Sequence, residues 1–278
     1  MSKGCEHLTN QKMSVIVLGS RGMLGSMVTW YGSAHTKYTI VPVSRTQFDA
    51  INQPVANLSV FLKDAVCVIN CIGGIPQKSY SDDELALLNT QFPLDLAAYC
   101  KEAGLPLLHI STNCVFSGEA GDCLEDAVPD ASDAYGISKA QGEPSSAVVL
   151  RCSIIGPELG SCFGLLEWFL HSNGHVNGFT DHYWNGLTTY ELAKQIFALI
   201  DRRDFGARIQ HFYAANTLSK YELLKVIADE FEKPCMIAPI VKGEKFYTLK
   251  SLVSPPCPEL QTQIHDLSVI WDNYRAFW

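Results

Sequence analysis

The chain has 278 residues, of which 47% are hydrophobic and 18% charged, which is typical of a globular protein with a large buried core. Its 29 acidic residues outnumber its 21 lysines and arginines, so the net charge at pH 7 is -8. Because sequence-independent binding of nucleic acid requires a basic stripe, we expect no nucleic-acid partner. A small anionic ligand remains compatible with this charge, since one or two local arginines can hold it.

The ten cysteines are scattered and form neither a C-x-x-C pair nor a cluster with histidine at zinc-ligand spacing. The polar start of the chain, residues 1–13, lacks the apolar core of a signal peptide, and no apolar run approaches the length of a membrane span. We therefore expect a cytoplasmic protein with free thiols, no membrane partner and no metal. A homodimer is one expectation for the oligomeric state, which the sequence leaves open.

Short apolar strands alternate with helical patterns in the first half of the chain. Apolar and β-branched runs predict strands at residues 14–18, 38–43, 65–69, 105–110 and 147–150. Apolar spacing and capping residues predict helices at 23–31, 82–103, 134–142, 165–170, 191–200 and 220–231.

Strands that are apolar throughout are typical of a parallel sheet covered on both faces. The predicted fold class is therefore α/β, a Rossmann-type doubly wound parallel sheet with a smaller C-terminal substrate-binding region. We expect residues 1–150 to form the nucleotide-binding domain, with 180–203 returning to it. Residues 151–278 would be mainly the substrate-binding region.

The first predicted strand runs into a glycine-rich turn with the spacing G-x-x-G-x-x-G, followed by a predicted helix. In such a unit the first glycine permits the tight turn, the second lets the backbone approach a pyrophosphate, and the third lets the helix pack on the sheet. A tight turn without a ligand is the alternative. We predict a dinucleotide site formed by Gly19, Ser20, Arg21, Gly22, Met23, Leu24 and Gly25.

The end of the second predicted strand indicates which dinucleotide binds. An NAD site places an acidic residue about 20 residues past the glycines, on the ribose 2′-hydroxyl. Here the strand ends in Val43-Ser44-Arg45, and the first acid is Asp49. A guanidinium offers a planar donor fork to a 2′-phosphate, and Arg21 can add a second one. We predict NADP(H), bound in part by Ser44 and Arg45, with a solvated loop arginine as the alternative.

A tyrosine and a lysine lie four residues apart at the start of the third predicted helix. Residues i and i+4 share a helix face, so Tyr135 and Lys139 are predicted neighbours. The lysine can lower the pKa of the phenol and hold a cofactor ribose, and the tyrosine can deliver a proton to a carbonyl oxygen. Thr112, at the end of an apolar strand, can hydrogen-bond the same oxygen. An ordinary surface pair and a strand-end cap are the alternatives.

In this order, the three motifs resemble the extended branch of the short-chain dehydrogenase/reductase superfamily. The segment Ile110–Gly118, ISTNCVFSG, resembles S-T-D-x-V-F-x-G of the dTDP-4-dehydrorhamnose reductase family. Residues 150–153 resemble the R-T-S strand of that family, and residues 181–189 fall where it has a substrate-side loop. The resemblance covers nearly the whole chain and is specific in its first two thirds.

The resemblance implies a role for each matching residue. Thr112, Tyr135 and Lys139 would be catalytic. The residues that border the cofactor would include Cys71, Ile72 and Gly73. The substrate would be bound by Asn113, Gln77, His182, Trp184 and Asn185. The sequence departs from the family pattern at Asn113, where the family has Asp, and in the substrate-side loop, so the nucleotide and the sugar stay open.

Cys114 is a further departure from that family. A cysteine two residues after the catalytic Ser or Thr also occurs in GDP-fucose synthase and in the plant reductases that finish UDP-rhamnose, where it acts as a base in epimerising the carbons beside the ketone. The resemblance makes Cys114 a candidate catalytic residue, with His171, His175 or His182 as its acid partner. A buried strand-end thiol is the alternative.

We therefore expect an NADPH-dependent reductase of a nucleotide-activated 4-keto-6-deoxy sugar of the dTDP- or UDP-4-dehydrorhamnose type. The alternatives are a bifunctional 3,5-epimerase/4-reductase, a reductase of another activated sugar such as an N-acetylated one, and a non-catalytic regulatory subunit like that of methionine adenosyltransferase. An intact Tyr135 and Lys139 argue against the regulatory subunit. Candidate cations for the charged substrate are Arg151, Lys242 and Lys245.

Overall fold

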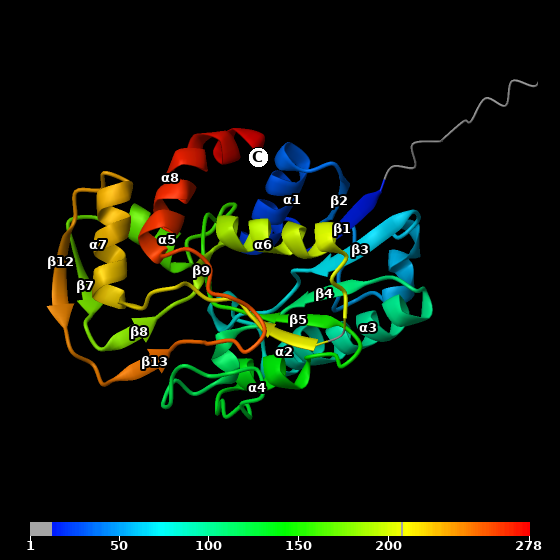
Figure 1. Ribbon diagram of the computed structural model, residues 1–278, viewed down its shortest axis with the longest axis horizontal. Coiled ribbons are helices and arrows are strands. Elements are labelled where there is room, and N and C mark those ends of the chain that lie inside the picture. The colour runs from blue at the N-terminus through cyan, green and yellow to red at the C-terminus, as the bar shows by residue number, and fades with distance from the viewer. Residues whose placement is uncertain (1–12, 207) are drawn as a thin grey trace, which may run out of the picture.

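The computed structural model describes residues 13–206 and 208–278, so the expectation about a leader, which concerns the start of the chain, falls almost entirely outside the described residues. Its main sheet has six parallel strands in the order β10-β5-β4-β3-β1-β2 (Figure 1). These strands are β1 (Ser14–Leu18), β2 (Thr39–Val43), β3 (Ala65–Asn70), β4 (Leu107–Ile110), β5 (Val148–Arg151) and β10 (Arg208–His211). The predicted α/β class with a Rossmann-type parallel sheet is confirmed.

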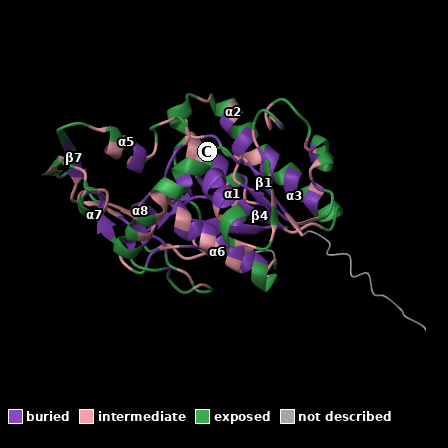
Figure 2. Ribbon diagram, turned by 90° about the horizontal axis from the view of Figure 1, so that it is seen from above, coloured by how far each residue is buried: buried purple, intermediate pink, exposed green. Residues whose placement is uncertain are grey.

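Helices cover both faces of this sheet, because successive residues of each strand point to opposite faces. In β1, Val15 and Val17 pack in the core cluster that contains α1 (Met23–His35) and α6 (Thr189–Arg202). Their neighbours in β1 pack on the opposite side, in the cluster that contains α3 (Phe92–Glu102). Figure 2 shows the strands and the inner faces of these helices buried, and their outer faces exposed.

The helix predicted over residues 82–103 is interrupted by one wider turn. It consists of α2 (Asp82–Ala86), the π-helical turn η3 (Leu87–Gln91) and α3. Ser81 caps its start in a capping box with Glu84, as the sequence predicted. Pro93 near the start of α3 lacks the N–H that an α-helix would direct at residue 89, which accounts for a wider turn at this point. Such turns are frequent at functional sites.

The predicted helices at 134–142, 165–170 and 220–231 are present as α4 (Ala134–Gln141), α5 (Leu165–His171) and α7 (Lys220–Glu230). The sequence did not predict the strand β10, the helix α8 or the short strands of the small sheets. The strand β10 has the polar sequence RIQH and joins the main sheet beside β5, and α8 (Leu260–Phe277) packs against α1, α6 and α7. The chain after residue 151 thus contributes both α6 and β10 to the layers of the main sheet, while the domain boundaries stay a prediction.

Three small sheets lie to one side of the main sheet (Figure 1). The first pairs β6 (Ile154–Ile155) with β9 (Leu187–Thr188), and the second pairs β7 (His175–Phe179) with β12 (Met236–Ile240). In the third, β8 (His182–Trp184) lies between β11 (Leu218–Ser219) and β13 (Lys245–Tyr247).

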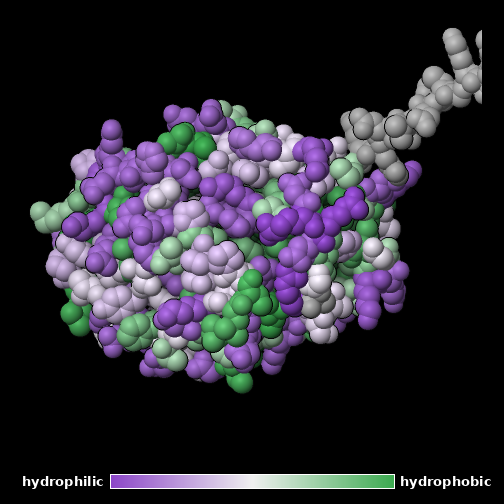
Figure 3. All heavy atoms as spheres, in the orientation of Figure 1, coloured by the Kyte–Doolittle hydropathy of each residue, from purple (hydrophilic) through white to green (hydrophobic). Residues whose placement is uncertain are grey.

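The surface is mostly hydrophilic on the face drawn in Figure 3, with apolar side chains in scattered groups. In the part of the chain that the structure describes, we find no helix with the length and apolar content needed to cross a bilayer.

Candidate active site

The glycine-rich turn lies where β1 leads into α1, and its close contacts require glycine. Gly19 has a φ of +74°, and a side chain there would lie 3.0 Å from the backbone of Cys71. A Cβ on Gly25 would lie only 2.1 Å from the carbonyl oxygen of Gly19. The amide of Gly22 donates a hydrogen bond to the same carbonyl over 2.9 Å. The turn therefore leaves a bare backbone cradle beside the start of α1, which suits a phosphate group.

A cavity of about 230 Å³ lies beside this turn. Of the predicted cofactor residues, it is lined by Gly19, Arg21, Gly22, Arg45, Cys71, Ile72 and Gly73. Ser20, Leu24 and Gly25 are buried instead, and the Met23 side chain lies against Gly164. The Ser44 hydroxyl is hydrogen-bonded to Gln47 over 2.9 Å.

Three cationic side chains line this cavity, in a protein that is acidic overall. They are Arg21, Arg45 and Lys78. Arg45 donates a hydrogen bond from Nη1 to the hydroxyl of Tyr80 over 3.3 Å, and its Nε lies 3.5 Å from Oδ2 of Asp49. The cradle and the cations together fit the phosphates of NADP. Sequence reasoning missed Lys78 and Tyr80. These residues belong to no local motif, and only the packing of the segment after β3 brings them close to Arg45.

Lys139 is buried and is tied to the end of β4. Its Nζ donates a hydrogen bond to the carbonyl oxygen of Ile110 over 2.8 Å. Burial lowers the pKa of Lys139 to about 8, and the Glu143 carboxylate opposes this shift. A Cβ on Gly73 would lie 3.9 Å from this ammonium, so Lys139 borders the cofactor cavity that Gly73 lines.

Tyr135 lies one turn before Lys139 on α4 and lines a second cavity. A Cβ on Gly136 would lie 2.4 Å from the carbonyl oxygen of Cys114, so this glycine lets α4 pack closely on the segment after β4. Burial raises the pKa of Tyr135, and the nearby Thr112 side chain opposes this shift. This net direction is opposite to the lowering expected from Lys139, because desolvation of the phenolate is the largest cause.

The second cavity has a volume of about 390 Å³. Its lining contains four of the predicted catalytic or substrate-binding residues, namely Asn113, Cys114, Tyr135 and Trp184. Thr112 is buried and is not part of this lining. Its hydroxyl oxygen accepts a hydrogen bond from the amide of Cys114 over 3.1 Å, which leaves its own hydrogen free to donate. Trp184 donates from Nε1 to the hydroxyl of Ser153 over 2.8 Å, which holds the indole in the cavity wall.

Three residues predicted to bind substrate do not line this cavity. Asn185 is buried and exchanges hydrogen bonds of 2.8 and 2.9 Å with the backbone of Leu249. The ring of His182 packs on that of Phe179, with centroids 4.7 Å apart. Gln77 is exposed in the short turn after β3.

None of the three histidines considered as partners of Cys114 lines the cavity either. The cavity is lined instead by a lysine, Lys220, at the start of α7. Burial raises the pKa of the Cys114 thiol, Asp133 adds to this, and Lys220 opposes it. Sequence reasoning missed Lys220 because it lies far from Cys114 in the chain and belongs to no motif.

Asn89 is a second residue that the sequence did not single out. It lies in the π-helical turn and is fully buried. Its side chain accepts a hydrogen bond from the amide of Gly74 over 2.8 Å and donates to the carbonyl of Gly74 and to the hydroxyl of Ser138, each over 3.1 Å. Asn89 thus connects the loop beside the cofactor cavity to the helix that carries Tyr135 and Lys139.

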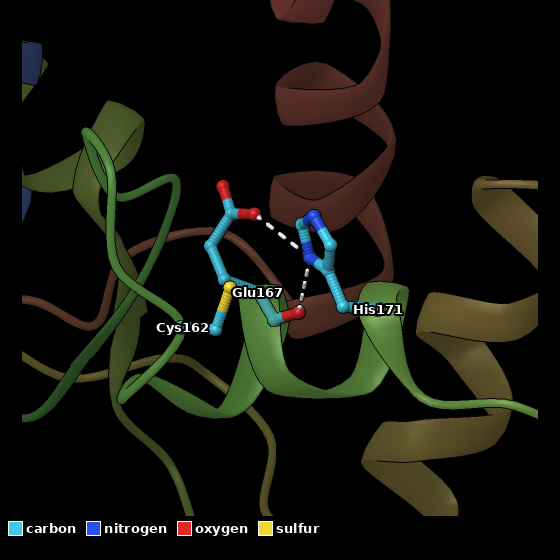
Figure 4. Close-up of side chains that lie close together, drawn as sticks. All are labelled: Cys162, Glu167 and His171. Carbon is cyan, nitrogen blue, oxygen red and sulfur yellow. Dashed lines mark hydrogen bonds and ion pairs between the residues drawn. The ribbon is translucent and has the colours of Figure 1, made fainter.

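A cluster of possible metal ligands lies elsewhere, beside α5, where Cys162, Glu167 and His171 point toward one another (Figure 4). Glu167 already forms an ion pair with Arg275 and accepts a hydrogen bond from the amide of Glu158 over 3.1 Å. His171 contacts the backbone carbonyl of Glu167 through Nδ1 over 2.8 Å. Two of the three residues, Glu167 and His171, thus already have protein partners.

The parallel sheet, the glycine-rich cradle and the Tyr135/Lys139 pair define a Rossmann-type protein of the short-chain dehydrogenase/reductase class. Residues 13–249 match the family model described as RmlD substrate binding domain, and the chain belongs to that family. The resemblance to the dTDP-4-dehydrorhamnose reductase family is confirmed.

Proteins of more than one kind are similar to this chain in sequence or in structure. A dTDP-4-keto-6-deoxy-D-glucose reductase from Streptomyces niveus is 25% identical, over 76% of either chain. The methionine adenosyltransferase 2 subunit beta of Xenopus tropicalis is also 25% identical, over 79% of this chain and 72% of its own. The structure of a dTDP-4-dehydrorhamnose reductase from Bacillus anthracis in complex with NADP superposes with a TM-score of 0.80 at 18% identity and covers 93% of this chain and 99% of that one.

Proposed function

We propose that this protein is an NADPH-dependent reductase of a nucleotide-activated 4-keto-6-deoxy sugar. One observation carries the proposal: α4 connects the two cavities through two of its side chains. Tyr135 lines the second cavity, and the Lys139 ammonium lies close to Gly73, which lines the first. A helix that presents an acid to one cavity and holds a cation close to the other suits a carbonyl reduction with the cofactor in one and the sugar in the other.

Within this proposal, NADPH supplies a hydride when it is bound. Tyr135 donates the proton to the ketone oxygen, and burial favours the protonated phenol, which is the form that an acid needs. Lys139 stabilises the phenolate that remains, since a nearby ammonium offsets the developing negative charge. The Thr112 hydroxyl, whose oxygen is held by the amide of Cys114, orients the ketone by donating its hydrogen.

Three cations support NADPH as the cofactor. Arg21, Arg45 and Lys78 line the first cavity, and one charge-assisted bond to a 2′-phosphate distinguishes NADPH from NADH.

The named activity of the Streptomyces niveus relative supports the sugar substrate. The Xenopus tropicalis subunit beta supports the competing regulatory role, and the buried Lys139 next to Tyr135 favours catalysis over it.

A second activity, epimerisation of the carbons beside the ketone, is favoured by the position of Cys114 in the wall of the same cavity as Tyr135. The raised pKa of the thiol acts against it in the free protein, because a base must first lose its proton.

The deciding experiment is turnover of the purified protein with dTDP-, UDP- and GDP-linked 4-keto-6-deoxyhexoses, followed by the loss of NADPH absorbance. We expect oxidation of NADPH with at least one of the three. A protein that binds NADPH but reduces none of them would contradict the proposed reductase and favour the regulatory role.

A further inference from the structure

Lys220 occupies a defined place in the wall of the second cavity. It is the first residue of α7 and directly follows β11. Because β11 pairs with β8, with Leu218 opposite Trp184, the start of α7 lies beside the indole that forms another part of the same wall. Tyr135 and Lys220 therefore line one cavity from two different parts of the chain.

Lys220 has no acidic partner among the described residues. No ion pair or hydrogen bond of its ammonium is found there, and Cys114 is the titratable group that acts on it. Burial lowers the pKa of Lys220, so keeping the ammonium charged at this place costs free energy in the free protein. An anion that enters the cavity would offset that cost.

The other candidate cations are already engaged or lie elsewhere. Arg151 is buried and binds Glu143 with two hydrogen bonds, from Nε over 2.8 Å and from Nη2 over 2.7 Å, so it is not available to a substrate. Lys245 lines the cavity but is paired with Glu119. Lys242 lies over the ring of Phe179, 4.9 Å from its centroid, and is not part of the lining.

The remaining charge in the cavity wall is acidic. Asp133 caps α4 and accepts a hydrogen bond from the amide of Gly136 over 2.9 Å. Within the lining that the structure describes, Lys220 is thus the one cation without an acidic partner.

We propose that Lys220 binds the diphosphate of the nucleotide-sugar substrate. This inference rests on the proposed function, and it assigns a substrate-binding residue that none of the sequence motifs contains. The diphosphate is the fixed anion of such a substrate. It is attached to the sugar ring at the anomeric carbon, which lies across the ring from C4. Tyr135, a proton donor, and Lys220, an unpaired ammonium, line one cavity, so one substrate can place its ketone at the first and its diphosphate at the second.

The test measures binding without turnover. The affinities of UDP, dTDP and GDP, and of the corresponding nucleosides, are determined by calorimetry with saturating NADPH, for the wild type and for Lys220→Met. We expect at least one nucleoside diphosphate to bind, and its affinity to fall about 10- to 100-fold in the variant, as for the loss of a hydrogen bond to a charged group. The affinity for the nucleoside should stay unchanged.

Two further variants make the result specific. Lys225→Met removes the same charge from an exposed position of the same helix and should leave the affinity for the diphosphate unchanged. Lys220→Arg should restore at least part of the affinity, and it also keeps the test valid if Lys220→Met folds poorly.

Three results would overturn the inference. They are an unchanged diphosphate affinity in Lys220→Met, an equal loss for nucleoside and diphosphate, and a wild type that binds no nucleoside diphosphate. Each is distinct from failure of the proposed reductase, which is judged by NADPH oxidation in the wild type.

Discussion

The ammonium of Lys139 donates a hydrogen bond to the carbonyl oxygen of Ile110 over 2.8 Å and so connects α4 to the end of β4. Thr112 follows Ile110 by two residues, and Tyr135 lies one helical turn before Lys139. This one contact therefore sets the helix that carries the phenol against the strand end that carries the hydroxyl. It also holds a buried charge close to Gly73, which lines the cofactor cavity.

The unfolding free energy should depend on pH through Lys139. Its pKa is about 8 in the folded protein and near its ordinary 10.5 in the unfolded chain. Between these values the unfolded chain holds more protons, so the wild type gains stability as pH rises through this window, by up to about 3 kcal/mol. Lys139→Met should lose this dependence, as measured by urea unfolding at pH 7 and pH 10. The exposed Lys101→Met is the control, and parallel pH profiles for wild type and Lys139→Met would contradict the assignment.

Tyr135→Phe should abolish most of the reduction while it preserves cofactor binding. The ring remains, but the proton donor is lost, and removal of one general acid typically costs about 10²-fold or more in rate. The measurement is NADPH oxidation with the best sugar substrate, together with the Kd for NADPH. Tyr99→Phe on α3 is the matched control. Near-native turnover of Tyr135→Phe would remove this phenol from the mechanism.

Arg45→Ala should weaken NADPH binding and leave NADH binding nearly unchanged. The lost interaction is one charge-assisted hydrogen bond to the 2′-phosphate, from a side chain that is 62% exposed. We expect an effect of about 1.5 kcal/mol, or roughly tenfold in Kd. Fluorescence titration with both cofactors measures it, and Arg202→Ala serves as a control. Equal losses for NADPH and NADH would mean that Arg45 does not distinguish between them.

Asn89→Ala should destabilise the protein by about 1 to 3 kcal/mol, because it leaves buried polar groups of Gly74 and Ser138 without their partner. Urea unfolding provides the measurement. Asn57→Ala, at an exposed position, should change stability by less than about 0.5 kcal/mol. If the two variants are equally stable, Asn89 does not hold the loop and helix together.

Cys114→Ser tests the second activity. If the thiol is an epimerisation base, wild-type protein should incorporate deuterium from deuterated water at C3 or C5 of the 4-keto sugar, and the variant should not. Reduction of an already epimerised ketone should persist, because proton abstraction at carbon and proton delivery to oxygen use different side chains. Mass spectrometry of the sugar without NADPH gives the answer. If the wild-type protein shows no exchange above the rate in buffer, the epimerase activity is contradicted and the reductase activity alone remains proposed.

Local patterns in the sequence were enough to predict much of the fold and part of the site. The apolar strands, the glycine spacing before α1 and the four-residue step from Tyr135 to Lys139 each depend on geometry within a few turns of chain. Side chains repeat every two residues in a strand and every 3.6 residues in a helix, so the spacing of residues indicates the type of element. The resemblance to the reductase family follows from the same short segments.

Only the tertiary structure decided which charges face the cavities. Arg151 ends an inner strand and turns to Glu143, whereas Lys220 comes from a distant helix to line the same cavity as Cys114. Lys78 reaches the cofactor cavity in the same way, from the loop after another strand. The partner of a charged side chain depends on segments that are far apart in sequence, and burial raised the pKa of Tyr135 where the motif alone predicted the reverse. Neither packing partners nor desolvation can be read from the spacing of residues along one chain.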